Sequence, residues 1–516
     1  MMNTNLTKTQ NDYAHFLPAL SGFYATFIGK QQVEEYVAKS RIPSNLPNGV
    51  ESLNYLNSTQ GKFQYKWSLY SAGHADLDIS KENPKEDMIR KRDRDSTWLL
   101  GDSGGFQIGK GVWEGNWKDP GCPKASKKRE DVLRWMDAYM DYGMILDIPA
   151  WVSRSDEGKK ATGVTTYQEA VNATKINNNY WIKHRSGECK FLNVLQGEDH
   201  TEAEDWYQQM KDYCDPKIYP NNHFNGWSMG GQNMCDVHLV LKRLISLRFD
   251  GLLEKGIHDV MHFLGTSKLE WAVLLTDIQR AVRKYHNDNF MITFDCASPF
   301  LATANGQIYC ELETTDRSKW VYRMVPSIDS LKLKNDTTPF GRAFVREGKH
   351  KSFIDSPITS ELLANDICVY GPGDKNKQGD IKILKGQPLL EKDGSIKLDK
   401  KNNQPILASK DSTSWDSFSY ALMMGHNVWM HINAVQEANR QYDKGLYPAM
   451  LIEEKFERIV FKDIVEEIFS TDNKDKANKI NNDYQKYLDT IKGTRGTIGK
   501  KMTSGKSKYK ELFIEV

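Results

Sequence analysis

The stretch Trp98-Leu99-Leu100-Gly101-Asp102-Ser103-Gly104-Gly105-Phe106-Gln107 is an apolar run that ends in an acidic residue and two glycines. Five later apolar runs also end in a small or polar residue, at Asp147, Gln196, Gly230, Gly265 and Asp295. From Asp102 onward, the successive separations of these end points are 45, 49, 34, 35 and 30 residues. Each interval is long enough for a helix and a return to a parallel strand. The pattern therefore predicts an α/β fold, a TIM-type (β/α)8 barrel whose strand ends share one mouth.

The expected elements follow from short apolar runs and from helical periodicity. We expect strands at 65–72, 143–147, 191–196, 226–230, 260–264 and 290–295, and irregular or mixed structure over residues 1 to about 60. A helix is expected before the second of these strands, where Val132, Trp135, Met136, Tyr139 and Met140 recur at helical spacing. Another helix is expected around residues 428–435. The order of helix and strand is the one that a barrel requires.

The chain divides into four expected parts. These are a barrel over residues 1–330, an insertion over 331–410, a terminal barrel helix within 411–445 and a C-terminal extension over 446–516. The insertion is rich in Lys, Gly, Asn and Asp, and its Asp393-Gly394 pair between alternating segments predicts a hairpin-rich subdomain. The extension ends in a basic tail, with seven Lys or Arg and no Asp or Glu over 492–510. This tail is either an arm that touches phosphates or a solvated terminus.

Composition limits the class of protein. Apolar residues make up 39% of the 516 residues, which is enough for a large core, and 70 basic residues against 68 acidic ones give no overall attraction to nucleic acid. The seven cysteines are scattered and odd in number, which fits a reducing compartment. The N-terminus lacks an apolar signal core, and no run of about 18 apolar residues occurs. We therefore expect a soluble cytoplasmic protein without a membrane partner.

Two carboxylates at one barrel mouth suit displacement at the anomeric carbon of a sugar. One of Asp102 and Asp295 would attack C1′, and the other would manage the proton of the leaving group. Asp147 could accept hydrogen bonds from the N–H groups of a purine edge, and Gln196 could both donate and accept. A single aspartate at a strand end is more often a helix cap or a ligand of loop amides. The coincidence of six such strand ends is what favours a site.

The motifs resemble the queuine and archaeosine tRNA-guanine transglycosylase superfamily, whose members exchange guanine for a 7-deazaguanine in an intact nucleic acid. The resemblance covers roughly residues 95–310 and 412–445, and Asp102-Ser-Gly-Gly-Phe-Gln107 is its most specific element. The other matching motifs follow in the family's order: Leu146-Asp147, Leu195-Gln196-Gly197, Gly226-Trp-Ser-Met-Gly230, Phe263-Leu264-Gly265 and Phe294-Asp295-Cys296. The bacteriophage DNA-guanine transglycosylases, the DpdA group, look like the nearest branch.

The resemblance implies a role for each matched residue. Asp295 would be the nucleophile that forms a covalent link to C1′, and Asp102 would be the general acid and base. Asp147 and Gln196 would hold the base edge, and Phe106 and Leu264 would enclose its faces. The backbone at Gly226 and Trp227 would meet the exocyclic groups of the base. Ser103 and Gly230 complete the predicted base-binding set.

Departures from the family pattern bear on the substrate. The tRNA enzymes carry two arginines after the nucleophile that read nucleotides beside the target guanine, and Leu301 and Ala304 stand at those positions here. Neither side chain can imitate a guanidinium group, so DNA is favoured over tRNA. Gly231 stands where queuine-type enzymes place a glutamate that supports an aminomethyl substituent. A neutral base such as 7-cyano-7-deazaguanine is therefore the expected substrate.

The family's structural zinc is expected to be absent. That zinc is held by a Cys-x-Cys-x-x-Cys cluster and a later histidine, whereas this sequence has only the isolated Cys368 and His426-Asn427 in that region. One cysteine and one histidine cannot complete a tetrahedral site. We therefore predict neither zinc nor another cofactor, with the insertion at 331–410 supplying the missing support by packing.

Three alternatives remain open at the level of sequence. The first is a tRNA-guanine transglycosylase that finds its guanine by different contacts, and the second is a non-catalytic subunit that binds nucleic acid beside a catalytic partner. The third is a barrel glycoside hydrolase that acts on free sugars. Phosphate contacts are predicted at Arg90, Arg92, Lys500 and Lys501, although each could equally be solvated surface. The oligomeric state is not predicted.

Overall fold

The computed structural model describes residues 12–30, 37–452 and 460–491. Its centre is an eight-stranded, all-parallel sheet in the order β1-β8-β7-β6-β5-β4-β3-β2. The strands are β1 His15–Pro18, β2 Trp67–Ser71, β3 Trp98–Asp102, β4 Tyr142–Met144, β5 Lys190–Leu195, β6 Gly226–Met229, β7 Val260–Phe263 and β8 Met291–Cys296. The two ends of this order meet, since Ala19 forms a parallel bridge with Leu69 and the Leu20 amide donates to the Leu69 carbonyl at 2.9 Å. The predicted (β/α)8 barrel is confirmed, in nearly closed form.

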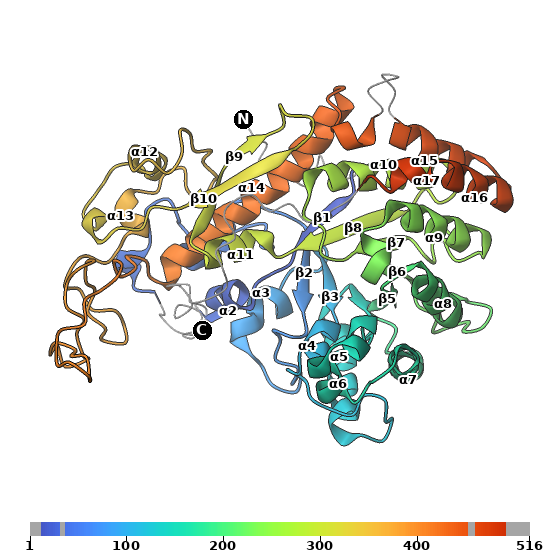
Figure 1. Ribbon diagram of the computed structural model, residues 1–516, viewed down its shortest axis with the longest axis horizontal. Helices are drawn as coiled ribbons and strands as arrows, with labels where there is room; N and C mark the ends of the chain where they lie inside the picture. Colours follow the sequence, from blue (N-terminus) through green and yellow to red (C-terminus); the bar gives the residue numbers. More distant parts are fainter. Residues whose placement is uncertain (1–11, 31–36, 453–459, 492–516) are drawn as a thin grey trace.

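Helices cover the outside of the barrel (Figure 1). The larger ones are α5 Pro123–Tyr139, α7 Tyr167–His184, α8 His200–Met210, α9 Val237–Phe249, α10 Leu269–Tyr285 and α14 Ser417–Asp443. Shorter ones are α2 Gly22–Lys30, α3 Asp87–Arg90, α4 Gly105–Gly109, α6 Asp156–Thr162 and α11 Ser298–Ala304. Side chains alternate between the two faces of each strand, so an outward residue packs on a helix and its neighbour enters the barrel.

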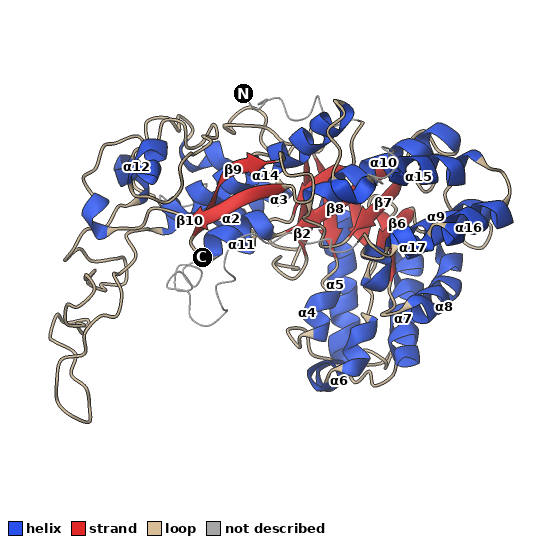
Figure 2. Cartoon of the chain, turned by 45° about the horizontal axis from the view of Figure 1, so that its top comes forward, coloured by secondary structure: helices blue, strands red, loops and turns tan. Residues whose placement is uncertain are grey.

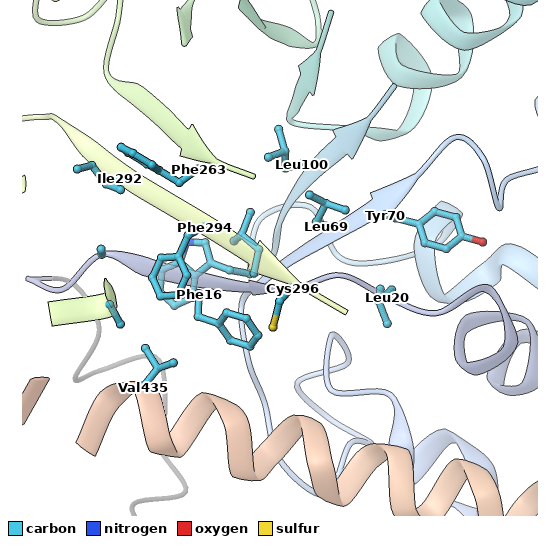
Figure 3. Close-up of a cluster of buried hydrophobic side chains, with 14 of the residues drawn as sticks. Phe16, Leu20, Leu69, Tyr70, Leu100, Phe263, Ile292, Phe294, Cys296 and Val435 are labelled. Carbon is cyan, nitrogen blue, oxygen red and sulfur yellow. The ribbon is translucent and has the colours of Figure 1, made fainter. Parts of the chain in front are cut away.

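The wall formed by β1 and β8 shows this alternation clearly. Phe16 and Phe294 lie side by side with ring centroids 5.7 Å apart, and both lie on the side of the wall that faces α14, near Val435 (Figure 3). Phe16 also stacks on the buried His431 ring of α14, at 4.4 Å. Because Phe294 points outward, its neighbours Thr293 and Asp295 face the barrel interior.

The sequence-based boundaries of the barrel strands agree with the structure to within about three residues, with one omission. The six expected strands from 65–72 to 290–295 correspond to β2 and to β4–β8, and the helix expected before β4 is α5. The helix around 428–435 is part of the much longer α14. The strand β1 was missed because it has only four residues and lies within a region of mixed composition. It is nevertheless buried along its whole length.

Residues 307–412 lie between α11 and α14 and add structure outside the barrel. An antiparallel hairpin of β9 Gln307–Glu313 and β10 Val321–Pro326 precedes two short helices, α12 Phe340–Arg346 and α13 Ala364–Ile367. The segment 371–412 then forms an arm, seen at the left of Figure 2, that contains isolated antiparallel bridges. One of these bridges, Leu390 with Ile396, spans the predicted Asp393-Gly394 turn. The predicted insertion, residues 331–410, therefore combines helices in its first half with hairpin turns in its second.

In the described part of the chain, three further α-helices follow α14: α15 Val460–Ser470, α16 Lys474–Asp483 and α17 Gln485–Leu488. They pack on α9 and α10; for example, Arg248 of α9 donates to the carbonyls of Phe469 and Thr471 at 2.9 Å. The predicted basic tail, with Lys500 and Lys501, lies outside the described residues. Within 12–30, 37–452 and 460–491, no helix has the length and apolar character needed to cross a membrane.

Candidate active site

A cavity of about 1310 Å³ opens at the mouth where the carboxyl ends of the barrel strands meet. The predicted site residues that line it are Asp102, Ser103, Phe106, Asp147, Gln196, Gly230, Leu264 and Asp295. They come from six different strand ends, as the barrel geometry requires. The sequence-based expectation that these strand ends share one cavity agrees with this arrangement.

Asp295 is held by two donors from the neighbouring strand and loop. Its Oδ1 accepts a hydrogen bond of 2.9 Å from the Gly265 amide and one of 3.2 Å from Nε2 of His262. Both bonds end on the same oxygen. His262 is fully buried beneath the cavity, whereas Asp295 lies on its surface. The carboxylate is thus oriented by the protein while it faces the cavity.

Asp102 has a different environment at the end of β3. Its Oδ2 accepts a 2.6 Å hydrogen bond from the hydroxyl of Ser71 on the adjacent strand β2. Burial raises the pKa of the Asp102 carboxyl, the Ser71 hydrogen bond opposes this, and the charge of Asp295 raises the pKa further. The two carboxylates are therefore close enough to influence each other. A carboxyl with a raised pKa is suited to donate a proton.

Asp147 and Gln196 form a buried polar pair. Nε2 of Gln196 donates to Oδ2 of Asp147 at 2.8 Å, and burial raises the pKa of Asp147 to about 7. The Gln196 backbone carbonyl in turn accepts from the side-chain amide of Asn233 at 3.1 Å. The pair therefore presents both donors and acceptors to a ligand, with a carboxyl that changes charge near neutral pH.

Two glycines allow the polar pair to approach the cavity closely. A Cβ placed on Gly105 would lie 2.9 Å from the Asp147 carbonyl oxygen, and one placed on Gly230 would lie 3.0 Å from Nε2 of Gln196. Side chains at these positions would force the backbone or the pair to move. Positions 105 and 230 therefore require glycine, because a side chain at either position would lie too close to Asp147 or Gln196.

Apolar side chains line the rim of the cavity. The Phe106 ring is 61% exposed and lies 6.1 Å from the Trp151 ring, with the Lys110 ammonium within 5.9 Å of both. Leu264 lines the same cavity from the end of β7. On α11, Leu301 is 57% exposed and also lines the cavity, together with Ala304. This part of the rim is therefore apolar, at the two positions where the tRNA enzymes that the sequence resembles carry arginines.

The prediction that the backbone at Gly226 and Trp227 meets the base is corrected, because the structure does not bring these residues to the cavity. They begin strand β6, whereas Gly230 follows its end, and four residues of strand span about 13 Å. The Trp227 side chain points outward, donates from Nε1 to the Leu252 carbonyl at 2.8 Å and lies against Tyr207 of α8. Both residues belong to the barrel wall, and the cavity is lined instead by Gly230 and Gly231.

The prediction that Arg90 and Arg92 contact phosphates is also corrected, because their guanidinium groups bind partners inside the protein. Arg90 binds Glu86 at 2.8 Å, with only 6% of its side chain exposed. Arg92 is more deeply buried, at 1% exposure, and binds Asp141 and the Thr97 hydroxyl. Neither side chain is available to a phosphate group. Basic residues next to a strand end are thus as easily structural as ligand-binding.

The residues nearest to the zinc site that the sequence resemblance implies do not fit a zinc ion. His426 is fully buried in α14, where Nε2 donates to the Tyr309 carbonyl at 2.8 Å and Nδ1 lies 3.0 Å from the Ser356 hydroxyl. Burial lowers the pKa of His426 to about 4, so its ring is neutral. The thiol of the buried Cys368 contacts the Ile328 carbonyl. Both nitrogens of the histidine are therefore committed to protein partners.

Three positioning residues were not singled out from the sequence: His262, Thr293 and Ser71. His262 is the one polar side chain within the apolar run 260–264, and Thr293 interrupts the run 290–294 in the same way. A polar residue inside a buried strand needs a partner, so these interruptions were the available signal. Ser71 carries no comparable signal, because serine is common at strand ends.

Comparisons with known proteins give no relative, since neither protein-family models nor curated protein sequences match the chain.

Proposed function

We propose that this chain is a transglycosylase that exchanges guanine in DNA for a 7-deazaguanine derivative through a covalent aspartyl-glycosyl intermediate. The observation that carries this proposal is the pair Asp295 and Asp102 in one cavity. Asp295 is oriented by two N–H donors, while the pKa of Asp102 is raised by burial. One carboxylate is thereby suited to attack and the other to transfer a proton.

The proposed reaction has two displacement steps. The Asp295 carboxylate forms a bond to C1′ of the nucleotide as the bond from C1′ to N9 of guanine breaks, and Asp102 gives its proton to the leaving base. The incoming 7-deazaguanine then loses its N9 proton to Asp102 and bonds to C1′, which releases Asp295. Both carboxyl groups return to their starting protonation states. The target nucleotide must leave the helical stack to reach such a cavity.

Asp147 and Gln196 are proposed to hold the edge of the base. The Asp147 carboxylate would accept from the N1–H and the exocyclic amino group, and Gln196 would complete the hydrogen bonds to that edge. The exposed Phe106 ring and Leu264 would pack against the two faces. A neutral base, 7-cyano-7-deazaguanine, is the proposed incoming substrate, because Gly231 supplies no side chain toward a cationic substituent.

DNA is proposed in preference to tRNA because of the apolar rim on α11. Leu301 and Ala304 line the cavity at the two positions where the tRNA enzymes carry arginines. These side chains offer no bidentate hydrogen bonds to the nucleotides that flank a target guanine. Recognition by this rim must then depend on packing.

The test is base exchange with labelled guanine, and separately with labelled 7-cyano-7-deazaguanine. Each base is offered to duplex DNA, single-stranded DNA and a tRNA pool in parallel reactions, and the recovered nucleosides are examined by mass spectrometry. We expect label in DNA alone. Label in tRNA alone would show that anticodon recognition uses other contacts, and binding without exchange would favour a non-catalytic subunit. Release of guanine that leaves an abasic site, without incorporation of label, would indicate a hydrolase.

A further inference from the structure

His262 connects the barrel interior to the candidate nucleophile. It lies on β7, is 0% exposed, and belongs to none of the motifs that predicted the site. Its Nε2 is 3.2 Å from Oδ1 of Asp295, and its Nδ1 is 2.9 Å from the Thr293 hydroxyl. The ring therefore contacts two residues of the neighbouring strand through both of its nitrogens.

The register of the barrel explains this geometry. His262 is the direct partner of Thr293 in the parallel pairing of β7 with β8. Thr293 and Asp295 are two residues apart, so they face the same side of β8. The intervening Phe294 packs outward against Phe16. The His262 imidazole can thus contact Thr293 beside it and Asp295, which lies nearer the mouth of the barrel.

The chemistry of the partners fixes the proton on the ring. An ionised carboxylate only accepts hydrogen bonds, so Nε2 must carry the hydrogen that it donates to Asp295. In the neutral ring Nδ1 is then a bare acceptor, and the Thr293 hydroxyl donates to it. The carboxylate selects this tautomer, because the other neutral tautomer would turn a lone pair toward Asp295. The Thr293 hydroxyl, which could donate or accept, then donates to Nδ1 and fixes the position of the ring.

We propose that Thr293 and His262 form a positioning pair, in which the Thr293 hydroxyl donates to Nδ1 and holds the imidazole ring in place, and His262 in its Nε2–H form orients the Asp295 carboxylate for attack. The second donor, the Gly265 amide, supports the same oxygen at 2.9 Å. The effect on attack rests on the proposed function. The tautomer itself does not, and it can be measured in the resting protein.

The first experiment compares Thr293→Val with Thr293→Ser. Valine keeps the shape and the β-branched preference for a strand but removes the donor, so the buried Nδ1 loses its partner and the ring is no longer held against Asp295. We expect Thr293→Val to slow formation of the covalent DNA adduct by about tenfold or more while the Kd for DNA changes by less than about twofold. Thr293→Ser restores the hydroxyl and is expected to recover the rate.

Thr276→Val is the matched control for loss of a buried threonine hydroxyl. Thr276 is also 0% exposed, and its hydroxyl accepts from the Ala14 amide at 3.0 Å, outside the cavity. Its variant is expected to lose stability without any change in adduct rate. Equal adduct rates in Thr293→Val and the wild type would overturn the proposed positioning, as would equal losses in the Thr293→Val and Thr276→Val variants.

The second experiment observes the tautomer by NMR of protein labelled with ¹⁵N at histidine. The ring signals of His262 are assigned by their loss in His262→Gln. We expect the Nε2–H form in the wild type and in both Thr293 variants, with the Nδ1 signal of Thr293→Val shifted downfield because that nitrogen has lost its hydrogen bond. An unchanged Nδ1 signal in Thr293→Val would overturn the proposed contact. An Nδ1–H form in the wild type would overturn the inference. If the wild type forms no adduct with DNA or tRNA but shows this pattern, the proposed function fails and the tautomer assignment stands.

Discussion

Asp147 and Gln196 follow the neighbouring strands β4 and β5 and are joined by a hydrogen bond of 2.8 Å in which the Gln196 amide donates to the Asp147 carboxyl. Because the pair is buried, the carboxyl ionises only near neutral pH. The charge of this group, and with it the proposed ability to accept two hydrogen bonds from a base, is therefore set by pH.

Base binding should weaken as the pH falls through 7. The pKa of Asp147 is raised to about 7, so the carboxylate that accepts purine N–H groups is mostly present above pH 7 and mostly lost below it. If only the ionised form binds, the Kd for 7-cyano-7-deazaguanine should be about tenfold higher at pH 6 than at pH 8. Calorimetric titrations at pH 6, 7 and 8 measure this. Asp147→Asn should bind weakly at all three values, and a wild-type Kd that does not change with pH would contradict the assignment.

Replacement of Asp295 and replacement of Asp102 should impair the proposed reaction at different steps. Asp295→Asn should abolish the covalent adduct, because the amide is a poor nucleophile, and should leave DNA binding intact. Asp102→Asn should stall exchange, because the leaving base has no proton donor. Denaturing gels for the adduct and filter binding for DNA separate the two effects. Exchange at the wild-type rate in either variant would exclude its assigned role.

Gly105→Ala should impair exchange by crowding the base-binding pair. The added Cβ would lie 2.9 Å from the Asp147 carbonyl oxygen, so the backbone of that loop must shift. We expect exchange to fall by about tenfold or more, since small misplacement at a reacting site is costly. Gly115→Ala is the control, because its Cβ would meet its nearest neighbour at an ordinary 3.4 Å. Similar activities of the two variants would mean that Asp147 is not held at its observed place.

The Arg92→Ala variant should unfold more easily than the wild type, whereas its binding to nucleic acid should not change. It removes a guanidinium group with 1% exposure from its bond to Asp141, which is 21% exposed. Breaking such a pair typically costs about 3 kcal/mol in the free energy of unfolding, as measured by urea denaturation. Arg94→Ala is the matched control, because Arg94 is 43% exposed and its ion pair is longer, at 3.6 Å; we expect a loss of under about 1 kcal/mol. A change in the salt dependence of DNA binding in Arg92→Ala alone would restore it as a phosphate contact.

Protein purified without added zinc should contain no stoichiometric zinc. The physical reason is that both ring nitrogens of His426 are occupied by the Tyr309 carbonyl and the Ser356 hydroxyl. Elemental analysis by mass spectrometry measures the metal content, and treatment with a chelator should leave the melting temperature unchanged. One zinc ion per chain would overturn this prediction.

The sequence predicted the barrel well because its strands carry two signals at once. Six apolar runs of the barrel each end in a small or polar residue that a buried strand does not favour, such as Asp102 or Gln196. The strand β1 has only four residues and no such ending, so its pairing with β8 could not be anticipated from local pattern. Tertiary contacts alone decide that His15–Pro18 is a strand.

Within the site, sequence position identified the strand ends better than it identified side-chain direction. Gly226 and Trp227 share a motif with Gly230, yet they lie at the far end of the same strand. Arg90 and Arg92 look like surface charges until their partners Glu86 and Asp141 are known. The contact between His262 and Asp295 depends on the register of two strands, which no local pattern specifies.

The position of β1 between β8 and β2 has a consequence for how the protein is made. This strand is synthesised early, but its paired strand β8 ends at Cys296 and leaves the ribosome much later. Until then, β7 presents an unpaired edge, and the wall that carries Asp295 does not exist. Asp295, the proposed nucleophile, is therefore among the last barrel residues to reach its place, so a nascent chain stalled before that point would lack both the closed barrel and the proposed reacting group.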